Sequence, residues 1–378
     1  TLNPQEAIGD YFDVLCVGEG ERPTLELVSQ LEKGGVHSHI PNMWFKRGSG
    51  VERNPPREFL QELDSLPFPD RRMWRDWQDQ RAAQRCDVLL SRGCPFNCSY
   101  CCNHAFRNVS GGNYVRHRSP QNIVKEIKDI LAELPKLKEI YLETETITLD
   151  TRWCIALCSE LEGLNKTLSR PLSFGANVRI TPNGNLEDIF SAFKKANFRF
   201  VKIGLESGSE RVRQEILRRN YSNRDIINSV ALARKYGLQI NLYNLIGVPG
   251  ETLSDFEETV AINRICKPDG HMTSIFFPYP GTDLYARCKE EGLLKGLLDT
   301  RNERERAVLD LPGFSRKQIQ ESFYLLDYYI RYDPESGRLR GIHIIFYKLY
   351  KRLFSLPLFR NLAGVLKKLS KPNTPFFI

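Results

Sequence analysis

The sequence predicts an α/β protein built on a parallel sheet that curves into a barrel or partial barrel. Three observations support this prediction: six apolar strand-like runs, helical patterns between them, and polar residues or glycines where the strand runs end. Regular strand–helix alternation is typical of parallel sheets, and six units without an obvious break favour a barrel over an open sheet. The 378 residues allow two or three domains and a core that needs no disulfide support.

The N-terminal segment predicts one strand–turn–helix unit. Residues 11–17 form a short apolar run, Gly18-Glu19-Gly20-Glu21 follows it, and a helical pattern covers 23–33. Residues 48–85 are rich in Pro, Arg, Asp and Trp and show little periodicity, which indicates a linker on the surface. Because the chain starts at Thr1 without a Met, we expect a fragment whose upstream part is missing.

The central segment supplies the predicted sheet and its helices. The strand-like runs are 86–92, 138–145, 172–179, 199–206, 238–246 and 272–278. The helical patterns between them lie near 120–134, 152–163, 186–196, 209–218 with 223–236, and 254–265. Parallel βα barrels build their sites from the C-terminal ends of the strands, so we expect the functional residues there.

The C-terminal segment carries the basic excess of the chain. The net charge is +8, and residues 331–378 hold ten Lys or Arg residues against two acidic ones, which accounts for all of it. Apolar residues recur there at helical spacing, among them Ile342, Ile345 and Leu349. We expect a helical cap with a solvated basic face. The alternative is an interfacial helix that docks on anionic lipid.

A cysteine-rich loop follows the first strand of the predicted sheet. Cys94, Cys98 and Cys101 have C-x3-C-x2-C spacing, and three thiolates from one loop suit a 4Fe-4S cluster with one open iron position. His104 would complete a Cys3His zinc set, so a non-enzymatic zinc-binding module is the alternative. Structural zinc sites usually pair ligands from separated segments, whereas these four lie within eleven residues, which favours the cluster.

This loop and its βα context resemble the radical S-adenosylmethionine (SAM) enzymes, whose hallmark is a three-cysteine loop after the first strand of a partial (β/α)6 barrel. The resemblance covers about residues 82–290. It implies an enzyme whose 4Fe-4S cluster is held by Cys94, Cys98 and Cys101. It also implies that the open iron chelates SAM, and that one-electron reduction gives a 5′-deoxyadenosyl radical that abstracts hydrogen from a substrate. A flavodoxin or ferredoxin would supply the electron.

The same resemblance assigns contacts with SAM to six positions: Tyr100, Glu145, Arg179, Glu206, Ser207 and Gly247. It places Tyr100 near the adenine, Arg179 at the carboxylate, and Gly247 in a turn beneath the adenine. Glu206 and Ser207 would meet the carboxylate or the ribose. Close relatives carry an Asp-Asp pair near Glu145, so the amine contact is open between Glu143 and Glu145, with Glu145 favoured. No catalytic side chain is assigned.

A narrower resemblance concerns the N-terminal part. Residues 13–21 and the run Leu66-Pro67-Phe68-Pro69-Asp70 are similar to the last βα unit and linker of cobalamin-binding radical SAM enzymes, which often transfer methyl groups. Their cobalamin-holding loop is not in this chain, so no residue is assigned to cobalamin. The alternative is a cobalamin-independent relative that performs a rearrangement, an oxidation or a sulfur insertion. The expected domains are a cobalamin-domain remnant (1–47), a linker (48–85), a radical SAM barrel (86–290) and a helical basic extension (291–378).

Composition also gives expectations about partners and compartment. No run reaches the roughly 18 apolar residues that a membrane span needs, and no signal-peptide pattern is present. We therefore expect a cytoplasmic protein, with residues 331–378 as the candidate contact with the cytoplasmic face of a membrane. We expect a small-molecule or lipid-like substrate. No aromatic-studded basic groove accompanies the charge, so we do not expect nucleic-acid binding.

Overall fold

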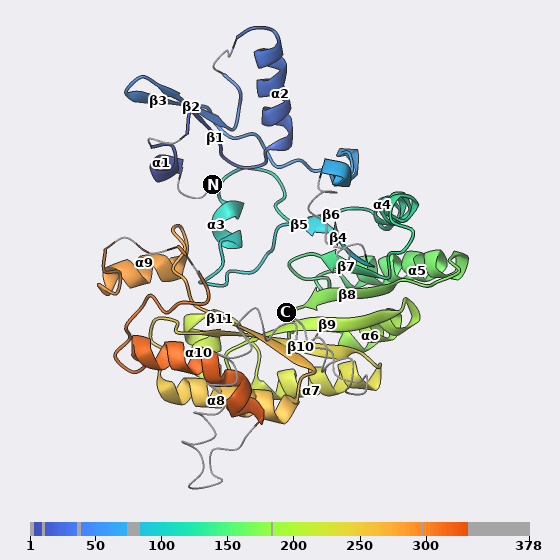
Figure 1. The fold of residues 1–378 in the computed structure, drawn as a ribbon, viewed down its shortest axis with the longest axis vertical. Coiled ribbons are helices and arrows are strands. Elements are labelled where there is room, and N and C mark those ends of the chain that lie inside the picture. The colour runs from blue at the N-terminus through green and yellow to red at the C-terminus, as the bar shows by residue number, and fades with distance from the viewer. Residues whose placement is uncertain are drawn as a thin grey trace, which may run out of the picture.

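A six-stranded parallel sheet forms the centre of the computed structural model, which describes residues 4–9, 12–35, 39–73, 84–182, 184–296, 298, 300–301 and 303–331 (Figure 1). The strands lie side by side in chain order: β4 (Arg85–Leu89), β7 (Glu139–Glu143), β8 (Ser173–Val178), β9 (Phe198–Glu206), β10 (Gln239–Ile246) and β11 (Gly270–Ile275). Each crossover therefore adds the next strand on the same side. With β4 and β11 at its two edges, this sheet confirms the predicted partial (β/α)6 barrel.

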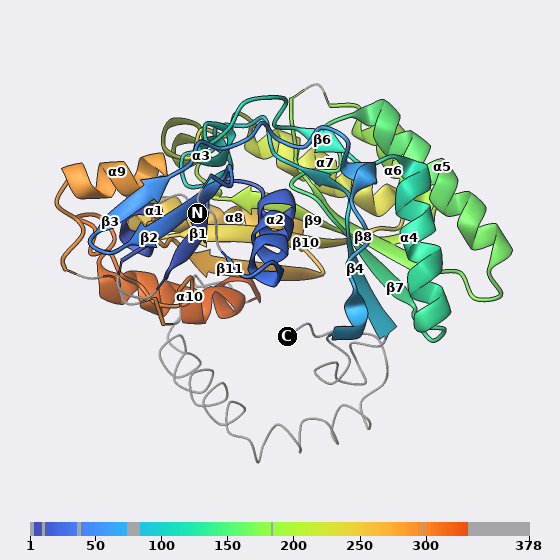
Figure 2. The ribbon, with the colours of Figure 1, turned by 90° about the horizontal axis from the view of Figure 1, so that it is seen from above.

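The helices between the strands form one layer on one side of the sheet (Figure 2). They are α4 (Pro120–Glu133), α5 (Thr151–Thr167), α6 (Leu186–Lys195), α7 (Asn223–Lys235) and α8 (Leu253–Cys266), and α10 (Arg316–Arg331) continues the layer beside α8 and β11. Capping boxes at Ser222 and Thr252 fix the starts of α7 and α8. The helical pattern expected over 209–218 is a short π-helical turn, Val212–Ile216.

The two faces of the sheet differ in chemistry. In β7, Ile140 and Leu142 are fully buried in the core between sheet and helices. Tyr141 and Glu143 alternate with them and point to the opposite face. The same alternation runs along β9, where Val201 belongs to that core. The face turned away from the helices therefore carries the polar and aromatic side chains.

The N-terminal residues form a separate three-stranded antiparallel sheet, β1 (Val14–Cys16), β2 (Met43–Arg47) and β3 (Gly50–Arg53), with α2 (Glu21–Glu32) between β1 and β2. The expected strand and helix are present. The β2–β3 hairpin was not expected, and it straddles the boundary placed between residues 47 and 48. The linker predicted from residue 48 onward therefore begins inside a hairpin, whose tight turn includes Gly48 at φ +58°. The domain boundaries themselves stay predictions.

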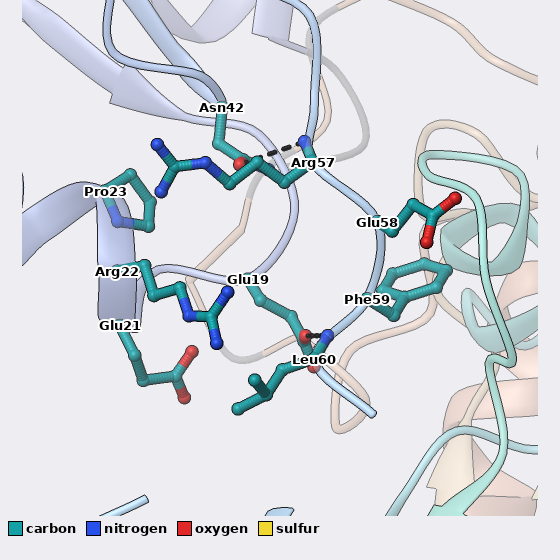
Figure 3. A pocket seen from close by; sticks show the side chains of 9 residues that line it. All are labelled: Glu19, Glu21, Arg22, Pro23, Asn42, Arg57, Glu58, Phe59 and Leu60. Carbon is teal, nitrogen blue, oxygen red and sulfur yellow. Dashed lines mark hydrogen bonds between the residues drawn. The ribbon is translucent and has the colours of Figure 1, made fainter. Parts of the chain in front are cut away.

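Glu19 attaches this N-terminal unit to the barrel. Figure 3 shows its carboxylate accepting a hydrogen bond of 2.8 Å from the backbone N–H of Leu60. Arg92 and Arg116 also donate to Glu19, each at 3.0 Å. They belong to a small antiparallel pair, β5 (Ser91–Arg92) and β6 (Arg116–His117), next to the barrel. Burial opposes ionisation, but the hydrogen bonds from Arg116, Leu60 and Arg92 outweigh it and lower the pKa of Glu19.

The expectations for two segments fall outside the described residues. Residues 74–83 include the tryptophans of the expected linker, and residues 332–378 include nearly all of the basic segment. Within the described ranges, no helix combines the length and the apolar character that crossing a membrane requires.

Candidate active site

The cysteine loop leaves β5 through a turn that only glycine fits. Gly93 has φ +85°, and a Cβ built there would lie 2.1 Å from the carbonyl oxygen of Tyr114. Farther along, the N–H of Ser99 donates to the carbonyl of Leu217 at 3.3 Å, and its hydroxyl donates to that of Ile216 at 2.5 Å. The loop is therefore fixed just before its first cysteine and again between Cys98 and Cys101.

The three thiols lie near one another at this place. Cys98 is buried, and Cys94 and Cys101 are partly buried. Burial raises the pKa of Cys94, and the charges of Cys98 and Cys101 act in the same direction, so all three are within electrostatic reach. Arg179 donates to Cys98 Sγ at 3.1 Å, and its guanidinium lies 3.7 Å from the ring centroid of Phe96. Three thiols with a cation beside them are a donor set that fits an anionic iron–sulfur cluster.

The zinc alternative lacks its geometry in this structure. In the ranges described, no three His, Cys, Asp or Glu side chains converge on a position for one metal ion. A mononuclear zinc site requires such convergence, whereas each thiolate of a 4Fe-4S cluster binds a different iron. His104 Nε2 lies 3.3 Å from Asp283 Oδ1.

Of Glu143 at the end of β7 and Glu145 just after it, Glu145 is the one beside the cysteine loop. Burial raises its pKa against a hydrogen bond from Asn103 that lowers it. Asn103 also lies 3.8 Å from Cys101 Sγ and accepts from the Tyr114 hydroxyl at 2.7 Å. Burial likewise raises the pKa of Glu143, but its charged neighbour is Lys202, on the sheet itself. The structure brings Glu145, and not Glu143, to the loop.

Arg219 is a buried residue of this site that sequence reasoning missed. Its guanidinium donates to the Tyr100 hydroxyl and to Glu206 Oε1, both at 2.8 Å, and to the carbonyl of Gly204 at 3.2 Å. Only 6% of Arg219 is exposed. Glu206 has φ +61°, and a Cβ on Gly204 would lie 2.4 Å from its carboxylate. Arg219 therefore joins the end of β9 to the residue before the last cysteine of the loop.

Ser207 is not brought to the site. Its side chain is fully buried and its hydroxyl lies 3.3 Å from that of Thr259 in α8. The hydroxyl also accepts from the N–H of Ser209 at 3.2 Å. These contacts hold the turn after β9 against the helix layer, so the predicted contact of Ser207 with SAM has no support in this arrangement.

Gly247 lies in the turn after β10, as expected, at φ +77°. Glu251 accepts hydrogen bonds from the N–H groups of Gly247 and Val248 with one carboxylate oxygen. Its other oxygen is buried without a hydrogen-bond partner in the described part of the chain. Burial raises the pKa of Glu251 to about 8, so this carboxyl is mostly protonated at neutral pH.

Comparisons with known proteins agree with this geometry. A family model described as the Radical SAM superfamily matches residues 88–261. An uncharacterized methyltransferase of Pyrococcus horikoshii is 30% identical over 330 residues, which cover 83% of this chain and 68% of that protein. An anaerobic magnesium-protoporphyrin IX monomethyl ester cyclase of Cereibacter sphaeroides is 22% identical and is matched over 74% of this chain and 45% of its own length.

A solved structure shows the same fold. The radical S-adenosylmethionine methyltransferase TsrM of Kitasatospora setae, with cobalamin and a [4Fe-4S] cluster bound, matches 85% of this chain and 65% of its own chain. The TM-score is 0.63 at 18% identity, which confirms the fold class. The chain thus spans less than half of the cyclase and about two thirds of the other two proteins.

Proposed function

This chain belongs to the radical SAM superfamily, and from that membership we propose that Cys94, Cys98 and Cys101 hold a 4Fe-4S cluster that binds SAM. The observation that supports the proposal best is the convergence of the three-thiol loop with the ends of β7, β8 and β9, which carry Glu145, Arg179 and Glu206. When bound, the reduced cluster would supply the electron that cleaves SAM to a 5′-deoxyadenosyl radical. The chain is an enzyme, and its exact reaction is the subject of the proposal.

The protein side chains position this chemistry. Arg219 holds Tyr100 and Glu206 in one buried network, so the loop and the end of β9 keep a fixed separation. Arg179 places positive charge next to Cys98, which would offset part of the negative charge of a cluster. Glu145 presents a carboxylate to a bound amine.

We further propose that the intact protein transfers a methyl group with the help of cobalamin. The Pyrococcus relative named a methyltransferase and the cobalamin-bound TsrM structure support this choice over rearrangement, oxidation or sulfur insertion. In this chain the N-terminal unit would be the end of the cobalamin-binding domain. The proposal places the cobalamin-holding loop outside this chain. If the purified chain bound one corrinoid per molecule, that placement would be wrong.

Anaerobic reconstitution with iron and sulfide tests the central proposal. We expect about four irons per chain, a brown protein, and 5′-deoxyadenosine after adding SAM and dithionite. Cys98→Ala should abolish cluster and product. Cys16→Ala is the matched control, because Cys16 lies in β1 of the N-terminal unit and should leave both unchanged. A colourless protein that holds one zinc would overturn the proposal.

For partners and compartment we propose a cytoplasmic enzyme that takes electrons from a flavodoxin or ferredoxin and acts on a small-molecule or lipid-like substrate, without nucleic acid. The basic excess of residues 331–378 supports contact with an anionic membrane surface. Flotation with liposomes of neutral or mixed anionic lipid, comparing the full chain with a truncation after Tyr332, tests this. Flotation that is equal for both chains would contradict a membrane role of the segment.

A further inference from the structure

Lys202 lies in the middle of β9, on the face of the sheet that turns away from the helices. Its neighbours in the sequence, Val201 and Ile203, belong to the core beneath the helices, so its own side chain points the other way. The strand register places it beside Asn177 of β8 and Asn241 of β10. Its ammonium group therefore lies among the central strands and not at an edge of the sheet.

Two tyrosine rings flank this ammonium group. Lys202 Nζ lies 3.8 Å from the ring centroid of Tyr141 and 5.8 Å from that of Tyr243. Cation–π contacts of this kind favour a cation but offer its N–H groups no strong hydrogen-bond acceptor. Tyr141 is itself held in place, because its hydroxyl donates to Asn177 Oδ1 at 2.6 Å. The ring closest to the ammonium group is therefore held in a fixed position.

Lys202 has no anionic partner in the part of the chain that the structure describes. The side chain is partly buried, and no carboxylate there forms an ion pair or hydrogen bond with it. Among the carboxylates, Glu143 at the end of β7 acts most strongly on Lys202, but the two residues do not form an ion pair. Burial and the nearby Arg85 lower the pKa of Lys202 against the opposing charges of Glu143, Asp87 and Glu139, none of which forms an ion pair with it.

The layer nearer the starts of the strands is different. There, Arg85 is 3.5 Å from Asp87 and 3.8 Å from Glu139, and Arg199 is 2.8 Å from Glu139. These charges neutralise one another within the protein. Lys202 lies nearer the C-terminal ends of the strands than these ion pairs do. Because it has no ion-pair partner in the described residues, it is suited to an anion that comes from outside the protein.

We propose that Lys202, between Tyr141 and Tyr243, binds an anionic group of the substrate, a carboxylate or a phosphate. This rests on the proposed function, because that function makes this face of the sheet the interior of a catalytic barrel. Glu206 lies four residues farther along β9, or about 13 Å at roughly 3.3 Å per residue. A substrate anchored at Lys202 would therefore have to span about that distance to reach the strand end where Glu206 is proposed to contact SAM.

Protection of Lys202 from chemical labelling tests the proposal on the wild-type chain, reconstituted anaerobically and used without SAM or dithionite. The chain is methylated with formaldehyde and a borane reductant, and peptides are quantified by mass spectrometry. Potassium phosphate or potassium acetate at 50 mM replaces potassium chloride at constant ionic strength. We expect one of the two anions to slow labelling of Lys202 at least fivefold, while the exposed Lys289 reacts at its previous rate. Slower labelling with phosphate but not with acetate indicates that the substrate carries a phosphate group. Slower labelling with acetate but not with phosphate indicates a carboxylate. Equal rates in all three salts would overturn the proposal.

Variants give a second measurement. The effective anion should raise the thermal midpoint of the wild type and of Lys202→Arg, and the Lys202→Met variant should need at least tenfold more anion for the same shift. Lys289→Met is the matched control and should respond like the wild type. An unchanged response of Lys202→Met would overturn the proposal. Cleavage of SAM by the wild type is measured separately, so loss of the proposed function and loss of the anion site give different results.

Discussion

Replacing Glu251 with glutamine changes how the stability of the protein depends on pH. The buried carboxyl has a pKa of about 8 in the folded chain against a usual value of 4.5. Between these values the folded state holds a proton that the unfolded state has lost, so the free energy of unfolding falls by about 1.4 kcal/mol per pH unit as the pH rises. Integrated over the window, the loss is about 5 kcal/mol, and it is complete above pH 8.

Glutamine keeps the shape of the protonated acid and one oxygen that accepts from the N–H groups of Gly247 and Val248, but it does not titrate. Urea unfolding of both proteins at pH 6, 7 and 8 measures the effect under anaerobic conditions. We expect Glu251→Gln to gain about 2 to 3 kcal/mol relative to the wild type between pH 6 and 8. Glu290→Gln, at an exposed position, is the control and should follow the wild type. Parallel pH profiles for Glu251→Gln and the wild type would refute the reasoning.

Three further predictions concern the loop and its supports. Arg219→Met should lower the free energy of unfolding by about 3 kcal/mol in urea titrations, because Glu206 loses its buried partner, whereas the exposed ion pair lost in Arg218→Met should cost under about 1 kcal/mol. Equal losses would contradict this. Gly93→Ala should reduce reconstituted iron to less than half, since a Cβ meets the Tyr114 carbonyl at 2.1 Å, and full iron loading would speak against a required glycine. Arg116→Met should make the N-terminal unit at least tenfold more sensitive to limited trypsin, and an unchanged cleavage pattern would show that this arginine does not hold it.

The central sheet could be predicted from the sequence because its strands are buried on the helix side and end in polar residues. The expected runs 138–145 and 172–179 contain β7 and β8 with offsets of one or two residues. The sequence predicts one strand over 86–92, but the chain leaves the sheet after Leu89 and pairs again as β5 with β6. Apolar periodicity carries no information on such a change of partner, because both pieces are strand-like.

The candidate site could be predicted only where the chemistry is encoded locally. The cysteine spacing identifies its loop, and strand ends identify Glu145 and Glu206. Nothing in the local sequence separates Arg219, which is buried, from its neighbour Arg218, whose side chain is about half exposed and pairs with Asp283. Which of two adjacent arginines turns inward depends on the π-helical turn before them and on the space beside Gly204. Both are tertiary properties.

The attachment through Glu19 has a consequence for the working enzyme. Arg92, one of the two arginines that donate to Glu19, is two residues before Cys94 in the chain. The orientation of the N-terminal unit and the position of the Cys94 thiol are therefore mechanically linked. A tilt of this unit that displaces Glu19 and Glu21, which both pair with Arg92, would also pull on the short segment that leads to Cys94.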